Sequence, residues 1–176
     1  MTTLIISGQD SDDLARKMNS DLAAVDNWCY ANSLALNAKK CEFMLFNEKT
    51  SQINNLKLFI QNNPINRVTE FKLLGIVVDE KLTWKKHIEY ISSKISQGIY
   101  GMRRVKHYVS RETLTKIYFA FVHSHLTYCN AIWGNTFNKY LNQLTVLQKR
   151  AIRIIHNAPY NAHTQTLFDS SKILQL

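Results

Sequence analysis

The sequence is poor in residues that break a chain or cross-link it. It contains only 5 Gly and 2 Pro among 176 residues, a composition that excludes a disordered or low-complexity protein. Its three cysteines, Cys29, Cys41 and Cys129, are odd in number and far apart, which argues against a disulfide framework or a zinc knuckle. No apolar run reaches the length of a membrane span, and the first residues lack the cationic start of a signal peptide. These absences predict a soluble intracellular protein, in the nucleus or the cytoplasm.

The sequence also lacks the motifs of a self-contained active site. It has no glycine-rich phosphate loop, no nucleophile elbow and no His/Cys spacing typical of a metal site. His123 and His125 are two residues apart and diverge on a helix, so packing or capping explains them better than a shared metal. Asp12 and Asp13 resemble a metal-binding carboxylate pair, but their place in the first turn of a helix favours interaction with the helix dipole. We expect no cofactor in this chain.

Acidic residues are scarce in the second half of the chain. Residues 1–80 carry 8 Lys and Arg against 10 Asp and Glu, whereas residues 81–176 carry 14 against 3. Such a basic half attracts polyanions over a long range, and nucleic acid is the first candidate. The alternative is a basic face that only keeps the protein soluble.

The hydrophobic pattern of residues 1–80 predicts a small mixed or antiparallel sheet with one helix. Asp10 or Ser11 is expected to cap that helix, and its buried stripe should run from Leu14 to Trp28. Strands are expected over residues 2–7, 41–46, 56–60 and 71–78, with a turn at 62–64. Together with the helical second half, this order predicts an α+β fold.

From residue 81 onward the apolar residues recur with a helical period. Thr83 and Ser110 are expected to cap the first two helices, Gly134 to end the second, and the third to end before Pro159. The second helix should point these residues inward: Leu114, Ile117, Phe121, Val122, Leu126 and Cys129. Because the connecting loops are short, the three helices are expected to form an antiparallel bundle.

Six short strings of residues occur in the order found in one enzyme family. They are Thr2-Thr3-Leu4-Ile5-Ile6-Ser7-Gly8; Asn27-Trp28 with residues 31–37 and Lys40; Phe71-Lys72-Leu73-Leu74-Gly75; Leu82-Thr83-Trp84 with His87-Ile88; Tyr128-Cys129-Asn130-Ala131-Ile132-Trp133-Gly134; and residues 147–155. In this order, over nearly the whole chain, they closely resemble the reverse transcriptase of non-LTR retrotransposons, especially the jockey and CR1-like lineages.

The resemblance implies that residues 1–80 are the last part of a polymerase palm and residues 81–176 a thumb. The catalytic aromatic-Ala-Asp-Asp motif is absent, because Met1 falls at or just after the place of its second aspartate. Cys41 stands where the family commonly has Thr, and Leu73 where it often has Tyr. The chain therefore looks like the carboxyl-terminal part of an RNA-directed DNA polymerase. Mg²⁺ is expected for the intact parent enzyme, whose carboxylates hold it, and we predict no DNA synthesis by this chain alone.

Two sites follow from the resemblance. Lys40 matches a lysine that acts as general acid toward the departing pyrophosphate in the intact enzyme only; the alternative is a solvated Lys39-Lys40 pair. The strand Phe71 to Gly75 resembles the primer grip, in which Lys72 would meet a phosphate while Phe71, Leu73 and Leu74 pack. An ordinary core strand with one exposed lysine is the alternative.

The basic second half predicts a nucleic-acid surface that reads no sequence. The expected phosphate-binding residues are Lys85, Lys86, Lys94, Arg103, Arg104, Lys106, Lys149, Arg150 and Arg153. The implied partners are an RNA/DNA template-primer duplex and the amino-terminal portion of such a polymerase, and no membrane. The competing function is a structural or protein-interaction domain with a solubilising basic face, while a sequence-specific transcription factor is disfavoured because no base-reading helix is evident.

Overall fold

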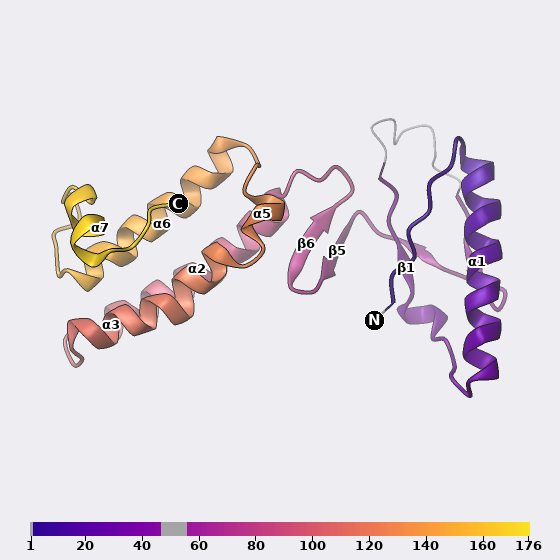
Figure 1. The fold of residues 1–176 in the computed structure, drawn as a ribbon, viewed down its shortest axis with the longest axis horizontal. Coiled ribbons are helices and arrows are strands. Elements are labelled where there is room, and N and C mark those ends of the chain that lie inside the picture. The colour runs from indigo at the N-terminus through magenta and orange to yellow at the C-terminus, as the bar shows by residue number, and fades with distance from the viewer. Residues whose placement is uncertain (1, 47–55) are drawn as a thin grey trace. The chain divides into compact units, whose positions relative to one another are not determined.

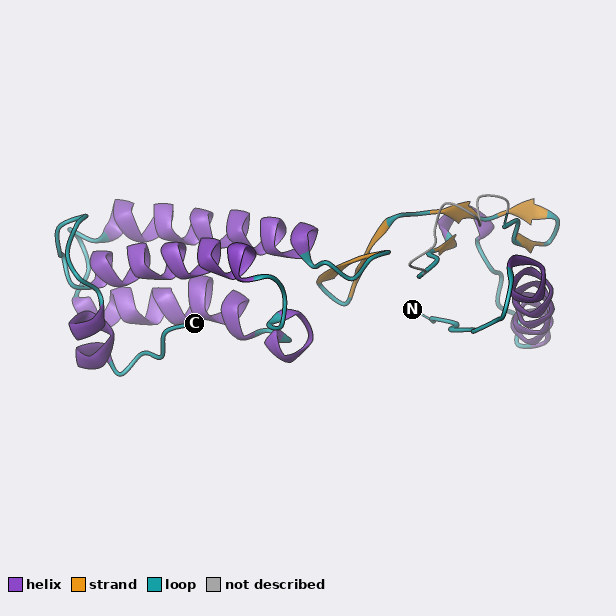
Figure 2. Cartoon of the chain, turned by 90° about the horizontal axis from the view of Figure 1, so that it is seen from above, coloured by secondary structure: helices purple, strands orange, loops and turns teal. Residues whose placement is uncertain are grey.

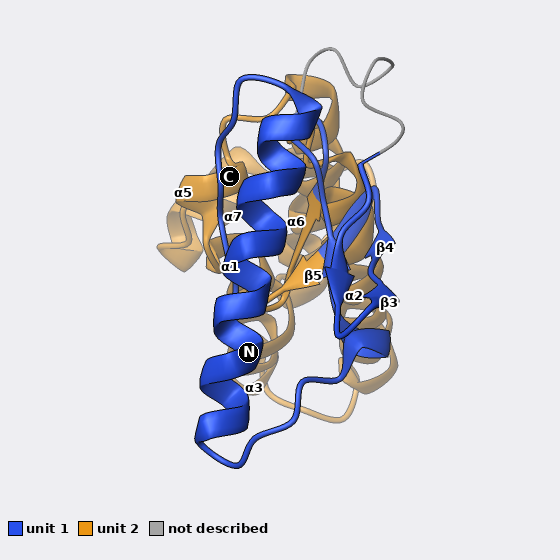
Figure 3. Cartoon of the chain, turned by 90° about the vertical axis from the view of Figure 1, so that its right-hand side faces the viewer, with its two compact units in different colours: residues 1–71, 79–81 blue, residues 72–78, 82–176 orange. Residues whose placement is uncertain are grey.

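The computed structural model describes residues 2–46 and 56–176, and the chain divides into two compact units (Figure 3). Unit 1 comprises Met1–Phe71 and Asp79–Lys81, and unit 2 comprises Lys72–Val78 and Leu82–Leu176. Unit 1 combines short strands with one long helix, whereas unit 2 is a helical bundle that carries most of one hairpin. The expected α+β fold with a helical bundle is confirmed.

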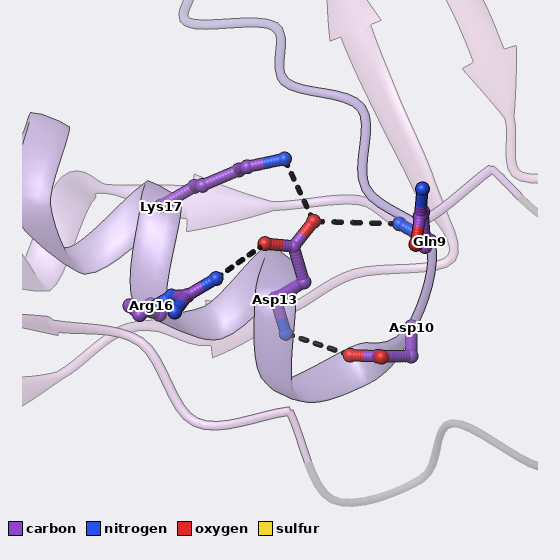
Figure 4. Close-up of polar contacts among 5 residues, drawn as sticks. All are labelled: Gln9, Asp10, Asp13, Arg16 and Lys17. Carbon is purple, nitrogen blue, oxygen red and sulfur yellow. Dashed lines mark hydrogen bonds and ion pairs between the residues drawn. The ribbon is translucent and has the colours of Figure 1, made fainter.

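Helix α1 (Ser11–Ala31) begins where the sequence predicted, with Asp10 as its cap. The Asp10 carboxylate accepts the backbone N–H of Asp13 at 2.7 Å. Asp13 in turn accepts hydrogen bonds from Lys17 at 2.7 Å and Arg16 at 2.8 Å (Figure 4). These two cations, Lys17 first, hold the pKa of the Asp13 carboxyl at about 2. The acidic residue Asp13 in the first turn of α1 is therefore paired with two cations of the same helix.

Asn19 joins α1 to the strands of unit 1. Its side-chain amide donates to the carbonyl of Lys57 at 3.2 Å, and its carbonyl oxygen accepts the N–H of Phe59 at 2.9 Å. The short elements beside α1 are η1 (Ala38–Lys40), β1 (Glu42–Phe43), β2 (Phe59–Ile60), β3 (Asn63–Pro64) and β4 (Asn66–Arg67). β1 pairs with β4 in parallel and β2 with β3 in antiparallel, around a small core of Leu58, Ile60 and Ile65.

Three expectations for unit 1 are wrong in detail. Residues 2–7 form no strand, since β-propensity makes a strand only where a second strand completes the ladder. Trp28, expected in the buried stripe of α1, is 61% exposed. The turn expected at 62–64 lies at Gln61 and Asn62, which both have positive φ, while Pro64 belongs to β3.

The expected strand 71–78 is a hairpin, with β5 (Glu70–Leu73) paired to β6 (Ile76–Asp79) (Figure 1). Its two turn residues, Leu74 and Gly75, have φ of 47° and 88°. Positive φ at both central positions is the pattern of the type I′ turn, which matches the twist of paired strands. Gly75 suits this turn, whereas Leu74 adopts it against its own steric preference.

Unit 2 is a bundle of long helices that lie side by side (Figure 2). Its elements are α2 (Lys85–Val105), α3 (Arg111–Tyr118), the π-helical turn η3 (Phe119–His123), α4 (Ser124–Thr127), α5 (Asn130–Trp133), α6 (Asn138–Ile155) and α7 (Gln165–Ser171). α2 packs against both α6 and the α3–η3–α4 segment around a core that includes Ile88, Ile95 and Trp133. Among the described residues, no helix is both long and apolar enough to cross a membrane.

The helix caps of unit 2 agree only in part with the sequence. The Ser110 hydroxyl accepts the N–H of Thr113 at 3.2 Å, as expected. Trp84, in a left-handed conformation, is the cap of α2, and Thr83 lies one residue before it. Gly134 ends the short α5 instead of a continuous second helix, because the chain leaves α4 at Tyr128 and turns at Cys129, whose φ is 52°.

The π-helical turn changes which residues of the second helix face inward. Leu114, Tyr118, Val122 and Leu126 are buried at constant spacings of four, whereas Phe121 is 57% exposed. Three turns of a regular α-helix take about 10.8 residues, because each turn takes 3.6. The step of twelve residues from Leu114 to Leu126 is therefore about one residue longer than three regular turns. The π turn supplies this residue and moves Phe121 out of the core.

Candidate nucleic-acid interface

Lys72 of the hairpin and Lys94 of α2 lie on the same tyrosine. The Lys72 ammonium donates to the Tyr90 hydroxyl at 2.9 Å and lies 4.3 Å from the ring centroid. The Lys94 ammonium lies 5.9 Å from that centroid. The hydrogen bond from Lys72 lowers the pKa of Tyr90. Neither lysine has an ion pair with an acidic residue in the part of the chain that the structure describes.

The apolar residues of the hairpin are more exposed than the primer-grip resemblance implied. Leu74 at the tip is 76% exposed, so the expectation that it packs is wrong, whereas Phe71 is 36% exposed. Leu73 is half-buried and meets that expectation. The difference arises because the two-residue turn places Leu74 at the apex, where a short hairpin offers no neighbouring strand.

The predicted cations of α2 are mostly exposed and unpaired. Lys86, Lys94, Arg103 and Arg104 are exposed, and no ion pair involves them within residues 2–46 and 56–176. Lys85 is also exposed and lies 3.9 Å from Glu89. Lys106, half-buried, donates to the Asn157 side chain at 3.2 Å. The first group is therefore free to contact phosphates, whereas Lys106 has a structural partner.

The three predicted cations of α6 lie opposite its buried face, which includes Leu144, Leu147 and Ala151. Arg150 is exposed, and Lys149 and Arg153 are half-buried. Arg153 is tied to the protein, because its Nε donates to the carbonyl of Ala162 at 3.0 Å. The expectation that Arg153 is purely a surface residue is therefore wrong. No contact found among the described residues joins these α6 cations to the Lys72–Tyr90–Lys94 group.

Lys40 ends the short helix η1 in unit 1 and its side chain is exposed. Its backbone N–H donates to the carbonyl of Asn37 at 2.9 Å. The described residues contain no group of three or more His, Cys, Asp or Glu that could hold a metal ion.

His123 and His125 do not share a site. The His123 ring lies 5.0 Å from the ring of Phe119 and 6.0 Å from that of Tyr118. His125 lies near Lys94, and burial together with that lysine lowers the pKa of its imidazole. The two side chains meet different neighbours, as their spacing on a helix predicted.

Sequence reasoning missed Tyr90 and assigned no role to Tyr128. Tyr90 lies four residues from both Lys86 and Lys94 on α2, a spacing that places all three on one side of the helix. Tyr128 belongs to one of the motifs of the family resemblance, and its hydroxyl donates to the carbonyl of Leu74 at 2.7 Å. Only the folded chain reveals that this motif contacts the hairpin.

Comparison with known proteins identifies the class of relatives. The homologues of this chain are RNA-directed DNA polymerases of mobile elements, which confirms the resemblance to non-LTR retrotransposon reverse transcriptases. No protein-family model matches the chain. No solved structure matches it either.

The individual relatives come from two fruit flies. The chain is 27% identical over 150 residues to the RNA-directed DNA polymerase from mobile element jockey of Drosophila funebris, an alignment that covers 83% of this chain. The jockey polymerase of Drosophila melanogaster is 25% identical over 158 residues, or 88% of the chain. A protein of that species named "Probable RNA-directed DNA polymerase from transposon BS" is 26% identical over 93% of the chain. The matches span only 16%, 17% and 18% of these three relatives, respectively.

Proposed function

We propose that this chain is a nucleic-acid-binding segment of a retrotransposon RNA-directed DNA polymerase, and that unit 2 contacts the phosphate backbone of a template-primer duplex. The observation that carries the proposal is the set of exposed cations on unit 2 that have no acidic partner among the described residues. Lys86, Lys94, Arg103, Arg104 and Arg150 belong to this set. Unpaired surface cations gain more from a polyanion than paired ones, because no salt bridge must first be broken.

Sequence-independent binding fits these side chains. Arginine donates two hydrogen bonds together to a phosphate, and lysine acts as a point charge. Positive charge that meets a duplex backbone releases condensed counterions, so affinity depends steeply on salt. We therefore expect similar affinity for duplexes of unrelated sequence.

The test is the affinity of the whole chain for an RNA–DNA hybrid, measured by fluorescence anisotropy over a series of salt concentrations. If about four cations touch phosphates, the slope of log affinity against log salt is near −4. The double variant Lys149→Ala with Arg150→Ala should bring this slope closer to zero by roughly two units. Arg153 is left intact because its bond to Ala162 supports the loop that follows α6.

Lys116→Ala is the matched control. Lys116 is an exposed lysine of unit 2 that is paired with Glu112 at 2.7 Å. Its removal should leave the slope nearly unchanged, because that ammonium already has a counterion in the protein. A flat salt response of the unmodified chain would overturn the proposal and favour the alternative, a protein-interaction domain with a solubilising basic face.

We further propose that residues 1–80 are the end of a polymerase palm, which includes the primer-grip-like hairpin, and that residues 81–176 are a thumb. In this proposal the chain does not polymerise alone, and Lys40 acts as general acid only within an active assembly. The exposed position of Lys40 is compatible with contact to a leaving group. In an assembly with an amino-terminal polymerase portion, Lys40→Ala should slow turnover with little effect on primer binding. Lys39→Ala should change neither turnover nor primer binding. Unchanged turnover in Lys40→Ala would refute its role.

A further inference from the structure

Residues 128–136, which lie between α4 and α6, contact the hairpin of unit 2, and we call this segment the connector. The hydroxyl of Tyr128 donates to the carbonyl of Leu74 at 2.7 Å. The ring of Tyr128 also covers the turn, since a Cβ on Gly75 would lie 3.6 Å from its Cε1 atom. The tip of the hairpin is thus held by one side chain, through a hydrogen bond and a ring contact.

A second contact holds strand β6 to α2. The Nδ1 atom of His87 accepts the backbone N–H of Val77 at 3.3 Å. His87 is 1% exposed, and its Nε2 atom has no hydrogen-bond partner among the described residues. Burial lowers the pKa of this imidazole and so favours the neutral form, which has the lone pair that Val77 needs.

Trp133 of the connector links these two contacts. Its indole N–H donates to the backbone carbonyl of Tyr128 at 3.0 Å. Its ring, fully buried, lies 5.7 Å from the ring of His87. The contacts therefore form a continuous chain from Leu74 through Tyr128, Trp133 and His87 to Val77, and both ends of this chain lie in the hairpin. All five residues belong to unit 2.

The backbone on both sides of the Tyr128–Leu74 bond is strained. Leu74 has a φ of 47° and Cys129 a φ of 52°. Residues with a Cβ rarely adopt this left-handed conformation, and they retain it where surrounding contacts over-determine it. At Cys129 the left-handed conformation prevents α4 from continuing into α5, and Tyr128 contacts the hairpin at this break. At Leu74 this conformation forms the tight turn whose carbonyl receives the hydrogen bond.

We propose that Tyr128 is a positioning residue that fixes the hairpin on the helical bundle and thereby presents Lys72, beside Tyr90 and Lys94, to a backbone phosphate of the bound duplex. This inference rests on the proposed function. A hairpin with strands of four residues is not stable alone, so the position of Lys72 depends on what holds the hairpin. Tyr128 reaches the duplex only through the hairpin and does not itself bind phosphate.

The first test measures the hairpin without nucleic acid. Tyr128→Phe removes one hydroxyl and keeps both the ring and the backbone carbonyl that Trp133 uses. We expect amide hydrogen exchange within residues 72–78 to become roughly fivefold to tenfold faster, the effect of losing one ordinary hydrogen bond. Exchange in α6 should not change. The control is Tyr108→Phe, because Tyr108 is 87% exposed and lies on the surface of the same unit. Unchanged exchange in Tyr128→Phe would overturn the inference.

The second test is a double-mutant cycle on binding of the RNA–DNA hybrid. Tyr128→Phe and Lys72→Ala should each weaken binding, and the double variant should bind no more weakly than Lys72→Ala alone. A merely structural role of Tyr128 would give additive losses, which would overturn the positioning role. Absence of salt-dependent binding by the unmodified chain would refute the proposed function and the role of Lys72 together. The exchange measurement would still decide whether Tyr128 holds the hairpin.

Discussion

Gly98 of α2 lies directly against Phe121 of the π-helical turn, and a Cβ on Gly98 would stand 2.9 Å from both the Cβ and the carbonyl oxygen of Phe121. The carbonyl is backbone and cannot rotate away. Three residues further along α2, a Cβ on Gly101 would meet no heavy atom of residues 2–46 and 56–176 within 4 Å. Replacing each glycine with alanine therefore distinguishes the effect of helix packing, at Gly98, from the effect of helix propensity, at Gly101.

Gly98→Ala should lower the free energy of unfolding by about 1–3 kcal/mol, the usual effect of overpacking a tight contact. Gly101→Ala should instead raise it by roughly 0.5–1 kcal/mol, because alanine is the better helix former and meets no obstacle. Urea denaturation followed by circular dichroism measures both. Similar effects of the two substitutions would show that the bundle does not need the close approach at Gly98.

Gln148 is expected to be the most sensitive polar residue of the bundle. It is 1% exposed, donates to the Tyr118 hydroxyl at 3.0 Å and to the carbonyl of Leu174 at 2.9 Å, and accepts the N–H of Leu176 at 2.9 Å. Gln148→Leu removes all three hydrogen bonds and should destabilise the protein by about 2–4 kcal/mol. Gln143→Leu, on the exposed side of the same helix, is the control and should change stability little. A neutral Gln148→Leu would mean that apolar packing replaces the network.

Leu74→Asn should stabilise the hairpin. Leu74 has a left-handed backbone, costing roughly 1–2 kcal/mol, and its side chain is 76% exposed, so little burial is lost. Asparagine followed by glycine is the preferred pair for this turn. We expect slower amide exchange in residues 72–78. The control is Leu174→Asn, an equally polar change at a residue that is 86% exposed and is not among those with positive φ. Faster exchange in Leu74→Asn would show that the leucine side chain itself holds the hairpin.

Stability should fall as the pH is lowered below about 6.5, the ordinary pKa of histidine. Burial is the main cause that lowers the pKa of His87, His125 and His156, with smaller contributions from Lys94 at His125 and Arg111 at His156. The unfolded chain then binds more protons than the folded one, so stability increases with pH through this range. The urea midpoint at pH 5.5 should be lower than at pH 7.5, and His87→Gln should reduce the difference. A midpoint that is higher at pH 5.5 would contradict the lowered pKa of these three histidines.

The local signals in the sequence predicted the helices well because each depends on neighbours in the chain. Asp10 and Ser110 cap helices through bonds to residues three positions away, and the apolar period of α2 is regular. The family resemblance was likewise carried by short local strings. The same local view failed for residues 2–7, since a strand requires a partner that sequence propensity does not provide.

The candidate site depends on contacts between distant residues, and these escaped prediction. Tyr128 and Leu74 are 54 residues apart, and Lys106 and Asn157 are 51 apart. No pattern of residue spacing in the sequence predicts that the two residues of either pair are in contact. The exposed position of Phe121 was also missed, because a π turn is recognised in sequence only when the buried positions are already known. Most of the expected phosphate-binding cations are exposed, but Lys106, Lys149 and Arg153 are half-buried. Lys85, Lys106 and Arg153 have partners within the protein.

The division into units has a consequence for how this protein can be cut or recombined. The chain passes from one unit to the other after Phe71, Val78 and Lys81. A recombinant piece starting at Leu82 would contain His87 and Tyr128 but not Val77 and Leu74, to which they bind. An expression boundary for the bundle therefore belongs before Glu70. For the same reason, a chimera of two related elements should take the hairpin and residues 128–136 from the same parent, although more than fifty residues separate Leu74 from Tyr128.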